Sequence, residues 1–151
     1  TVGQMQVLPG AANIVPGMVR FTVDLRSHIE SALDELHSRL YSAVEQACAR
    51  EGVSYTLDQV SDAKPAHLSP NLQDILEREA RVRGISTKRM ISRAGHDTQI
   101  MATLTDAALI FVPSKGGRSH CPEEWTDYAD LKKGADVLLG AVLAVAGAEL
   151  R

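Results

Sequence analysis

The stretch DAKPAHLSP, residues 62–70, divides this sequence into two parts that carry different patterns. It holds two prolines among small and polar residues, which is typical of a linker. Antiparallel strand patterns with one helix precede it, whereas short buried strands alternate with helices after it. We therefore expect two regions, residues 1–64 of α+β character and residues 65–151 of α/β character.

The region before the linker is predicted to begin with two antiparallel strands. Residues 18–26, MVRFTVDLR, alternate apolar and polar side chains, and residues 2–8, VGQMQVL, do so in part. Two Pro-Gly pairs between them predict a structured loop, which carries Asn13. Each strand is expected to expose one face to water.

A helix and a third strand are expected to follow. Ser27 and Glu30 have the spacing of a capping box, and apolar residues then recur at helical spacing until Gly52 supplies a C-cap. Residues 53–60, VSYTLDQV, alternate again and predict a strand. The expected result is one antiparallel sheet with a helix on one face and its other face uncovered.

The region after the linker has the pattern of parallel βαβ units. Ser69 and Pro70 predict the start of a helix that ends near Gly84. Strands are then predicted at 89–92 and 108–112, and helices at about 95–104 and 127–149. Parallel sheets typically have about five or six strands, so we expect the partner strands to lie outside this sequence.

Composition excludes several classes of protein. The 151 residues are 44% apolar and 23% charged, as in a globular protein. The net charge of −3 comes without a basic stripe, which argues against nucleic acid and anionic membranes as partners. The longest apolar stretch is 12 residues, at 137–148, whereas a bilayer span needs about 20. Two isolated cysteines, Cys48 and Cys121, indicate a reduced, cytoplasmic protein.

Residues 113–125, PSKGGRSHCPEEW, follow a predicted buried strand and are rich in chemically active side chains. Sites in α/β proteins are usually built at strand ends. His120 is the main candidate because histidine is the commonest metal ligand, the alternative being a hydrogen-bonded loop histidine. Glu123 and Glu124 are interpreted as solvated loop residues that lead into the last helix.

Several familiar catalytic motifs are absent from the sequence. The run Gly117-Arg-Ser-His-Cys121 lacks the second glycine of G-x-S-x-G, and the adjacent Ser119 and His120 cannot easily form a nucleophile–base bond. There is no G-x-x-x-x-G-K, G-x-G-x-x-G or H-E-x-x-H pattern. A serine hydrolase, a simple nucleotide-binding protein and a zincin are therefore not favoured.

Four further residues are candidates for a site. His96 and Asp97 open a predicted helix, where partial positive charge stabilises a carboxylate, and either side chain could line a cleft. Asn13 and Arg26 flank the predicted strand pair, and an arginine can hold a carboxylate bidentately. The alternative is that Asp97 only caps its helix and that Asn13 and Arg26 are ordinary surface residues.

Three separated stretches of this sequence resemble one family of enzymes. They are PGAANIVPGMVRFTVDLRS (9–27), RAGHDTQIMA (93–102) and FVPSKGGRSHCPEEWT (111–126). In this order they are similar to the N-carbamoyl-L-amino-acid hydrolase and allantoate amidohydrolase family, metal-dependent amidohydrolases related to aminoacylases and dinuclear carboxypeptidases. Arg93 stands where the family usually has a small residue, and Cys121 where serine is common.

The resemblance implies an architecture. The sequence is expected to be the C-terminal part of a longer protein, with residues 1–64 forming part of a small α+β lid that also dimerises. Residues 65–151 are expected to form the C-terminal part of an α/β catalytic domain. The intact protein is expected to be a homodimer, which would cover the edge that the early strands leave exposed.

The resemblance also implies roles for individual residues. His120 corresponds to the last ligand of a site for two divalent metal ions, which are zinc, manganese, cobalt or nickel in the family. Asn13 and Arg26 correspond to lid residues that hold the substrate carboxylate, and His96 and Asp97 to the wall of the site. The glycines 116 and 117 and Ser119 are expected to shape the substrate-binding loop.

The implied reaction is hydrolysis of a carbamoyl or ureido C–N bond by a metal-bound water. Substrates in the family are N-carbamoyl-L-amino acids, ureidopropionate-like acids or allantoate. The glutamate base and the other metal ligands are expected outside this sequence, so none of these residues is assigned as catalytic and the chain alone is predicted to be inactive. Two alternatives remain open: a noncatalytic lid and carboxylate-binding module, and an aminoacylase or peptidase of the same superfamily.

Overall fold

The computed structural model of this chain describes residues 1–147. The chain divides into two compact units, Thr1–Pro65 and Ala66–Arg151. Each unit combines helices with extended segments, so the mixed α and β character expected from the sequence is confirmed. None of the described helices is both long enough and apolar enough to cross a membrane.

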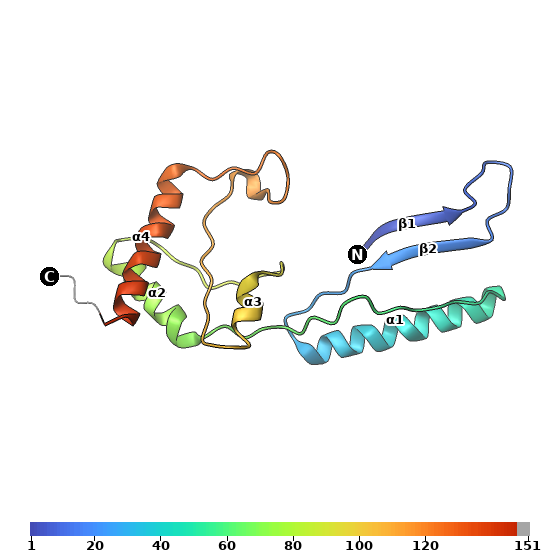
Figure 1. Cartoon of the computed structure of the whole chain (residues 1–151), viewed down its shortest axis with the longest axis horizontal. Helices are drawn as coiled ribbons and strands as arrows, with labels where there is room; N and C mark the ends of the chain where they lie inside the picture. Colours follow the sequence, from blue (N-terminus) through green and yellow to red (C-terminus); the bar gives the residue numbers. More distant parts are fainter. Residues whose placement is uncertain (148–151) are drawn as a thin grey trace. The chain divides into compact units, whose positions relative to one another are not determined.

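The first unit begins with a β-hairpin (Figure 1). Strand β1 (Val2–Leu8) pairs antiparallel with β2 (Met18–Val23), as their alternating side chains predict. The amide N–H of Gly17 donates to the carbonyl oxygen of Leu8 at 3.0 Å and closes the pair. The loop beyond that bond is structured, as expected, because the N–H of Ile14 donates to Ala11 O at 3.3 Å.

Helix α1 (Glu30–Glu51) follows the hairpin and buries one face, on which Leu33 is 8% exposed. It ends at Gly52, whose φ of 66° is the left-handed conformation that glycine adopts at helix ends. The expected capping box does not form. The hydroxyl of Ser27 accepts from Ile29 N–H at 3.1 Å, while the carboxylate of Glu30 accepts from Lys64 Nζ at 2.6 Å.

The strand predicted at residues 53–60 is wrong for the described structure. This segment has no regular secondary structure, and β1 and β2 form a sheet of two strands by themselves. Alternation predicts an extended chain, but a strand also needs a neighbouring edge that exchanges N–H···O=C bonds. Val60 is 94% exposed, so the segment lacks that neighbour among the described residues.

The second unit is organised by two packed helices. Helix α2 (Pro70–Val82) begins after Ser69 with proline at its first position, as predicted, and stops before Gly84 at φ 67°. Helix α4 (Tyr128–Val145) packs against it, and the contact encloses Ala80, which is fully buried. The predicted end of the last helix at residue 149 lies outside the described residues.

Helix α4 also approaches the segment that leads into the loop at 113–125. A β-carbon on Gly134 would lie 2.6 Å from Cγ1 of Val112, closer than real β-carbons approach other atoms. Glycine at this position therefore lets the helix lie directly against Val112. The loop that follows Val112 is anchored at its start by this contact.

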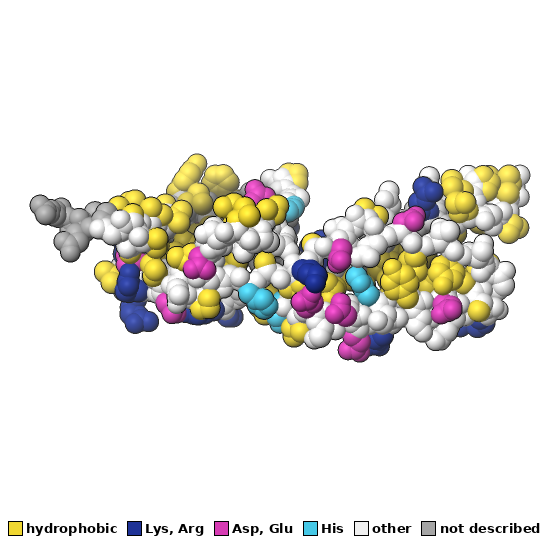
Figure 2. All heavy atoms as spheres, turned by 60° about the horizontal axis from the view of Figure 1, so that its bottom comes forward, with side chains coloured by type: hydrophobic (Ala, Val, Ile, Leu, Met, Phe, Trp, Pro, Cys, Tyr) yellow, Lys and Arg dark blue, Asp and Glu magenta, His cyan; other side chains and the backbone are white. Residues whose placement is uncertain are grey.

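The two strands predicted in this unit, at 89–92 and 108–112, are also wrong for the described structure. Both segments are extended, but neither pairs with a strand among the residues described. Arg89 instead donates to Glu77 Oε1 at 2.8 Å and to Asp74, so the first segment is tied to α2 by side chains. Figure 2 shows hydrophobic side chains on the surface. Ile91 and Phe111 are 54% and 47% exposed.

Helix α3 (Asp97–Met101) is shorter than the helix predicted at about 95–104. The chain continues in hydrogen-bonded turns, with the N–H of Leu104 donating to Met101 O at 2.9 Å. A short 3₁₀ turn, η1 (Lys115–Gly117), follows in the loop before α4. Of the residues that the sequence singles out in this unit, Asp97 lies in α3 and the glycines 116 and 117 lie in or at the end of η1, whereas His96 precedes α3 and Ser119 and His120 follow η1.

Candidate functional site

The loop at 113–125 is held by hydrogen bonds to its own backbone carbonyls. The N–H of Lys115 donates to Trp125 O at 2.7 Å, and the hydroxyl of Ser114 donates to Arg118 O at 2.5 Å. The two glycines at 116 and 117 lie at φ 67° and 66°, which L side chains rarely adopt. They therefore let η1 reverse the chain, and the loop presents residues 118–124 beyond this turn.

His120 also has a left-handed backbone, with φ 58°. Histidine is among the residues that tolerate this region, yet the conformation costs about 1–3 kcal/mol and needs support from its surroundings. Its side chain is exposed and makes no hydrogen bond or ion pair to any of the described residues. The imidazole nitrogens are therefore available to a ligand while the backbone is held.

Glu124 supplies that support: it is an exposed loop residue, as interpreted from the sequence, but its carboxylate also accepts hydrogen bonds from within the loop. Its carboxylate accepts from the N–H of His120 at 2.7 Å and from the hydroxyl of Ser119 at 3.3 Å. A turn places it there, because the N–H of Glu124 donates to Cys121 O at 3.0 Å with Pro122 at the second position. This turn residue pattern is the signal that could have indicated the role of Glu124.

Glu123 behaves as the sequence suggests. Its carboxylate lies 3.6 Å from Nη1 of Arg118, and both side chains are more than half exposed. An exposed ion pair of this kind contributes little. The two adjacent glutamates therefore differ, since only Glu124 contacts the backbone of His120.

His96 and Asp97 lie at the start of α3, as predicted. The His96 ring packs edge-on against Phe111, with ring centroids 5.4 Å apart and planes at 62°. Its Nε2 atom is buried and has no hydrogen-bond partner among the described residues. Asp97 is exposed in the first turn of the helix. The site-wall role of these two residues stays a prediction.

Arg26 lies just past the end of β2 and is held by Asp24. The guanidinium Nη2 donates to Asp24 Oδ2 at 2.7 Å, and Nε donates to both carboxylate oxygens at 3.0 Å. These hydrogen bonds, together with charge attraction, raise the pKa of Arg26 and lower the pKa of Asp24 more than desolvation opposes either shift. The pair thus stays charged near neutral pH.

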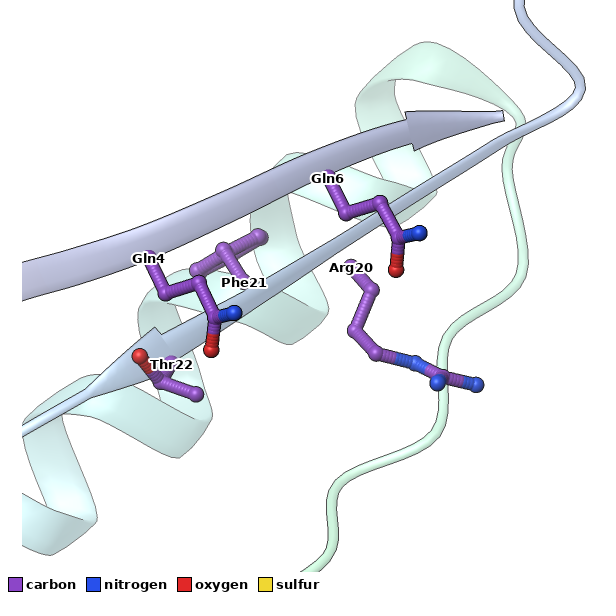
Figure 3. Close-up of a pocket in the computed structure, with 5 residues that line it drawn as sticks. All are labelled: Gln4, Gln6, Arg20, Phe21 and Thr22. Carbon is purple, nitrogen blue, oxygen red and sulfur yellow. The ribbon is translucent and has the colours of Figure 1, made fainter. Parts of the chain in front are cut away.

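Asn13 is exposed in the hairpin loop, whereas Arg26 follows the other end of β2 (Figure 1). The structure therefore does not bring these two side chains together. A cavity of about 190 Å³ lies on the hairpin, and Figure 3 shows the residues that line it. The cavity is lined by Gln4, Gln6, Arg20, Phe21 and Thr22, none of which was a candidate site residue from the sequence.

The described residues do not form a complete metal centre. No group of three or more His, Cys, Asp or Glu side chains in residues 1–147 is arranged to hold a metal ion. His120 nevertheless fits as one ligand, because its exposed imidazole is unengaged and neutral histidine nitrogen is a common donor to divalent metals. Further ligands have to come from other residues.

Comparison with known proteins decides the family. Residues 2–144 match the family described as Peptidase family M20/M25/M40. The chain belongs to this family. Within the M20/M25/M40 family it is similar to the N-carbamoyl-L-amino-acid amidohydrolase of Paenarthrobacter aurescens, with 41% identity over 96% of this chain and 35% of that protein. It is also similar to the allantoate amidohydrolase of Bacillus subtilis (strain 168), with 31% identity over 91% and 34%.

A solved structure agrees with these relatives. A crystal structure of an amidase of the hydantoinase/carbamoylase family from Burkholderia vietnamiensis superposes with a TM-score of 0.88 and 33% identity. The match covers 95% of this chain and 35% of that one. The resemblance stated from three stretches of sequence is thus confirmed, and the chain spans about a third of the length of the relatives it matches.

Proposed function

We propose that this chain is part of an amidohydrolase that cleaves the carbamoyl or ureido group of a small carboxylic acid. The observation that carries the proposal is the 41% identity to an N-carbamoyl-L-amino-acid amidohydrolase over 96% of the chain. N-carbamoyl-L-amino acids, ureidopropionate-like acids and allantoate are the proposed substrates. With water, such a carbamoyl group yields an amine, carbon dioxide and ammonia.

The two compact units are proposed to serve different purposes. The unit Thr1–Pro65 is assigned to a lid, and the unit from Ala66 onward to the C-terminal part of a catalytic domain. The unpaired extended segments at 89–92 and 108–112 support the second assignment, because apolar segments of this kind pair in the sheet of an α/β domain. The remaining strands would come from the other two thirds of the protein.

His120 is proposed to bind one of two divalent metal ions, which are zinc, manganese, cobalt or nickel. Such ions supply a nucleophilic water at neutral pH and polarise a carbonyl. The held backbone and unengaged imidazole of His120 support this role. The general base and the other ligands would lie outside residues 1–147, so the 151-residue chain alone is expected to release no ammonia from any of these substrates.

Arg26 is proposed to bind the substrate carboxylate. A guanidinium presents its N–H donors in a planar fork that matches a carboxylate bidentately, so the chemistry of Arg26 suits this role. Because β2 separates Asn13 from Arg26, we assign the carboxylate to Arg26 alone, and the substrate contact of Asn13 stays a prediction from the family resemblance. Gly116, Gly117 and Ser119 are proposed to shape the opposite side of the binding loop.

An aminoacylase or peptidase is the second candidate, favoured by the description of the matched family as peptidases. These enzymes would share His120 but would act on an acyl or peptidyl nitrogen. The two candidates differ in the group that is removed, so one assay separates them.

The intact protein is also proposed to be a cytoplasmic homodimer, in line with two free cysteines and the uncovered edges of the hairpin.

The test is a substrate screen with the full-length protein loaded with zinc, manganese, cobalt or nickel. N-carbamoyl-L-methionine, 3-ureidopropionate and allantoate are compared with N-acetyl-L-methionine and a dipeptide. The proposal predicts ammonia release from at least one of the first three. Hydrolysis confined to the acetyl compound or the dipeptide would replace it with the second candidate, and the isolated chain serves as the inactive control.

A further inference from the structure

We propose that Glu124 is a positioning residue for His120, acting through the backbone rather than through the imidazole. The inference rests on the proposed function, because the use of a held His120 is to bind metal. Glu124 itself is not proposed as a ligand, since its carboxylate is occupied by the N–H of His120 at 2.7 Å and the hydroxyl of Ser119 at 3.3 Å.

The backbone of His120 shows why it needs such a residue. At φ 58° the side chain leaves the chain in a direction that the ordinary extended or helical conformations do not give. The hydrogen bond of 2.7 Å from the His120 N–H to the side chain of Glu124 ties this part of the backbone to the turn that follows it. The bond therefore favours the left-handed conformation of His120, in which the imidazole is exposed.

The position of Glu124 is itself fixed by the turn that precedes it. The N–H of Glu124 donates to Cys121 O at 3.0 Å, so backbone and side chain of one residue both bond back to residues 119–121. Glu123 has no such bonds and instead lies 3.6 Å from Arg118. It is therefore a matched control with the same charge at the neighbouring position.

The proposal is one of geometry and not of charge, which substitutions can separate. Glu124→Gln keeps the length of the side chain, an oxygen that accepts from His120 N–H and an amide that can donate to Ser119. Glu124→Asp keeps the charge but shortens the reach by one methylene group. Glu124→Ala removes both. A positioning role predicts that Glu124→Gln retains metal binding by His120, whereas Glu124→Asp and Glu124→Ala weaken it.

The experiment measures cobalt(II) binding by the full-length protein, from the visible absorption of the bound ion. Glu124→Ala and Glu124→Asp are expected to weaken cobalt binding about 10- to 100-fold, the usual effect of removing a group that orients a metal ligand. Glu124→Gln and Glu123→Ala are expected to bind cobalt as the unmodified protein does. Thermal unfolding of each variant checks that the fold persists.

Three results would overturn the inference. If Glu124→Asp binds cobalt normally while Glu124→Gln does not, the charge of Glu124 matters and not its reach. If His120→Ala loses cobalt but all Glu124 variants keep it, the histidine binds metal without this support. Normal cobalt binding by His120→Ala would instead refute the metal role of His120 in the proposed function and, with it, the inference. The Asp and Gln pair keeps the test decisive should Glu124→Ala fail to fold.

Discussion

Two carboxylates hold the two residues to which we assign the main functional roles, but they do so in opposite ways. Asp24 bonds to the guanidinium of Arg26, the group that is proposed to bind substrate. Glu124 bonds to the N–H of His120 and leaves the imidazole exposed. The difference teaches that a carboxylate beside a functional residue can either engage its reactive group or fix the backbone behind it.

The largest expected effect is the loss of the imidazole. His120→Ala in the full-length protein should lower kcat/KM for an N-carbamoyl-L-amino acid by more than about 100-fold, because outer residues around a metal are themselves worth about 10- to 100-fold. Steady-state ammonia release measures this. His67→Ala removes an exposed histidine of the same unit and should leave activity unchanged. Equal activity of both variants would contradict the role of His120.

The next effect is on substrate binding at Arg26. Arg26→Ala should cost about 2–5 kcal/mol in kcat/KM for carboxylate substrates, since it removes one partner of a charge pair that is desolvated when substrate binds. The comparison is with Arg20→Ala, whose guanidinium lies on the polar face of the hairpin (Figure 3). An unchanged kcat/KM for Arg26→Ala would remove the carboxylate assignment.

A smaller effect is expected from the turn that presents His120. Gly117→Ala should lower the free energy of unfolding by about 1–2 kcal/mol, because residue 117 has φ 66° and a β-carbon is disfavoured there. Chemical denaturation measures the change. Gly17→Ala is the control, since that position also has open space around it but no left-handed φ. Equal stability of the two variants would mean that the turn is not strained.

The smallest effect concerns pH and the pair formed by Asp24 and Arg26. The hydrogen bonds from Arg26 lower the folded-state pKa of Asp24 below its ordinary value of 3.8. The pair therefore stabilises the fold above that value, and its contribution disappears as pH falls through the lowered pKa. Carbon NMR of the Asp24 carboxyl group should give a midpoint below 3.8 that rises in Arg26→Ala. An identical midpoint in both proteins would show that the pair does not form in solution.

How much of the fold the sequence could predict depends on whether the hydrogen-bond partners of each segment lie nearby in the sequence or far away. The strand Val2–Leu8 was predictable because its partner follows within the same hairpin. Helices α1, α2 and α4 were predictable because helical hydrogen bonds are local, and Gly52 and Pro70 mark their ends. Segments 53–60 and 108–112 have the composition of strands, but a strand also needs a partner, which their own residues do not encode.

The site could also be predicted only in part from the sequence. The concentration of glycines, Ser119 and His120 in one loop can be read directly from the sequence. The role of Glu124 was less visible, because Pro122 signals the turn at residues 121–124 but nothing in the sequence signals the positive φ of His120. The separation of Asn13 from Arg26 was also hidden, since thirteen residues can close on each other or, as here, span a strand.

The most direct test of the central claim is a crystal structure of the full-length protein with cobalt, read by anomalous scattering. The claim predicts an anomalous peak about 2.0–2.1 Å from an imidazole nitrogen of His120, the usual distance for a bound divalent metal. The Glu124 carboxylate should remain on the His120 N–H in that structure. A cobalt peak at a site that excludes His120, or none in an active protein, would contradict the account.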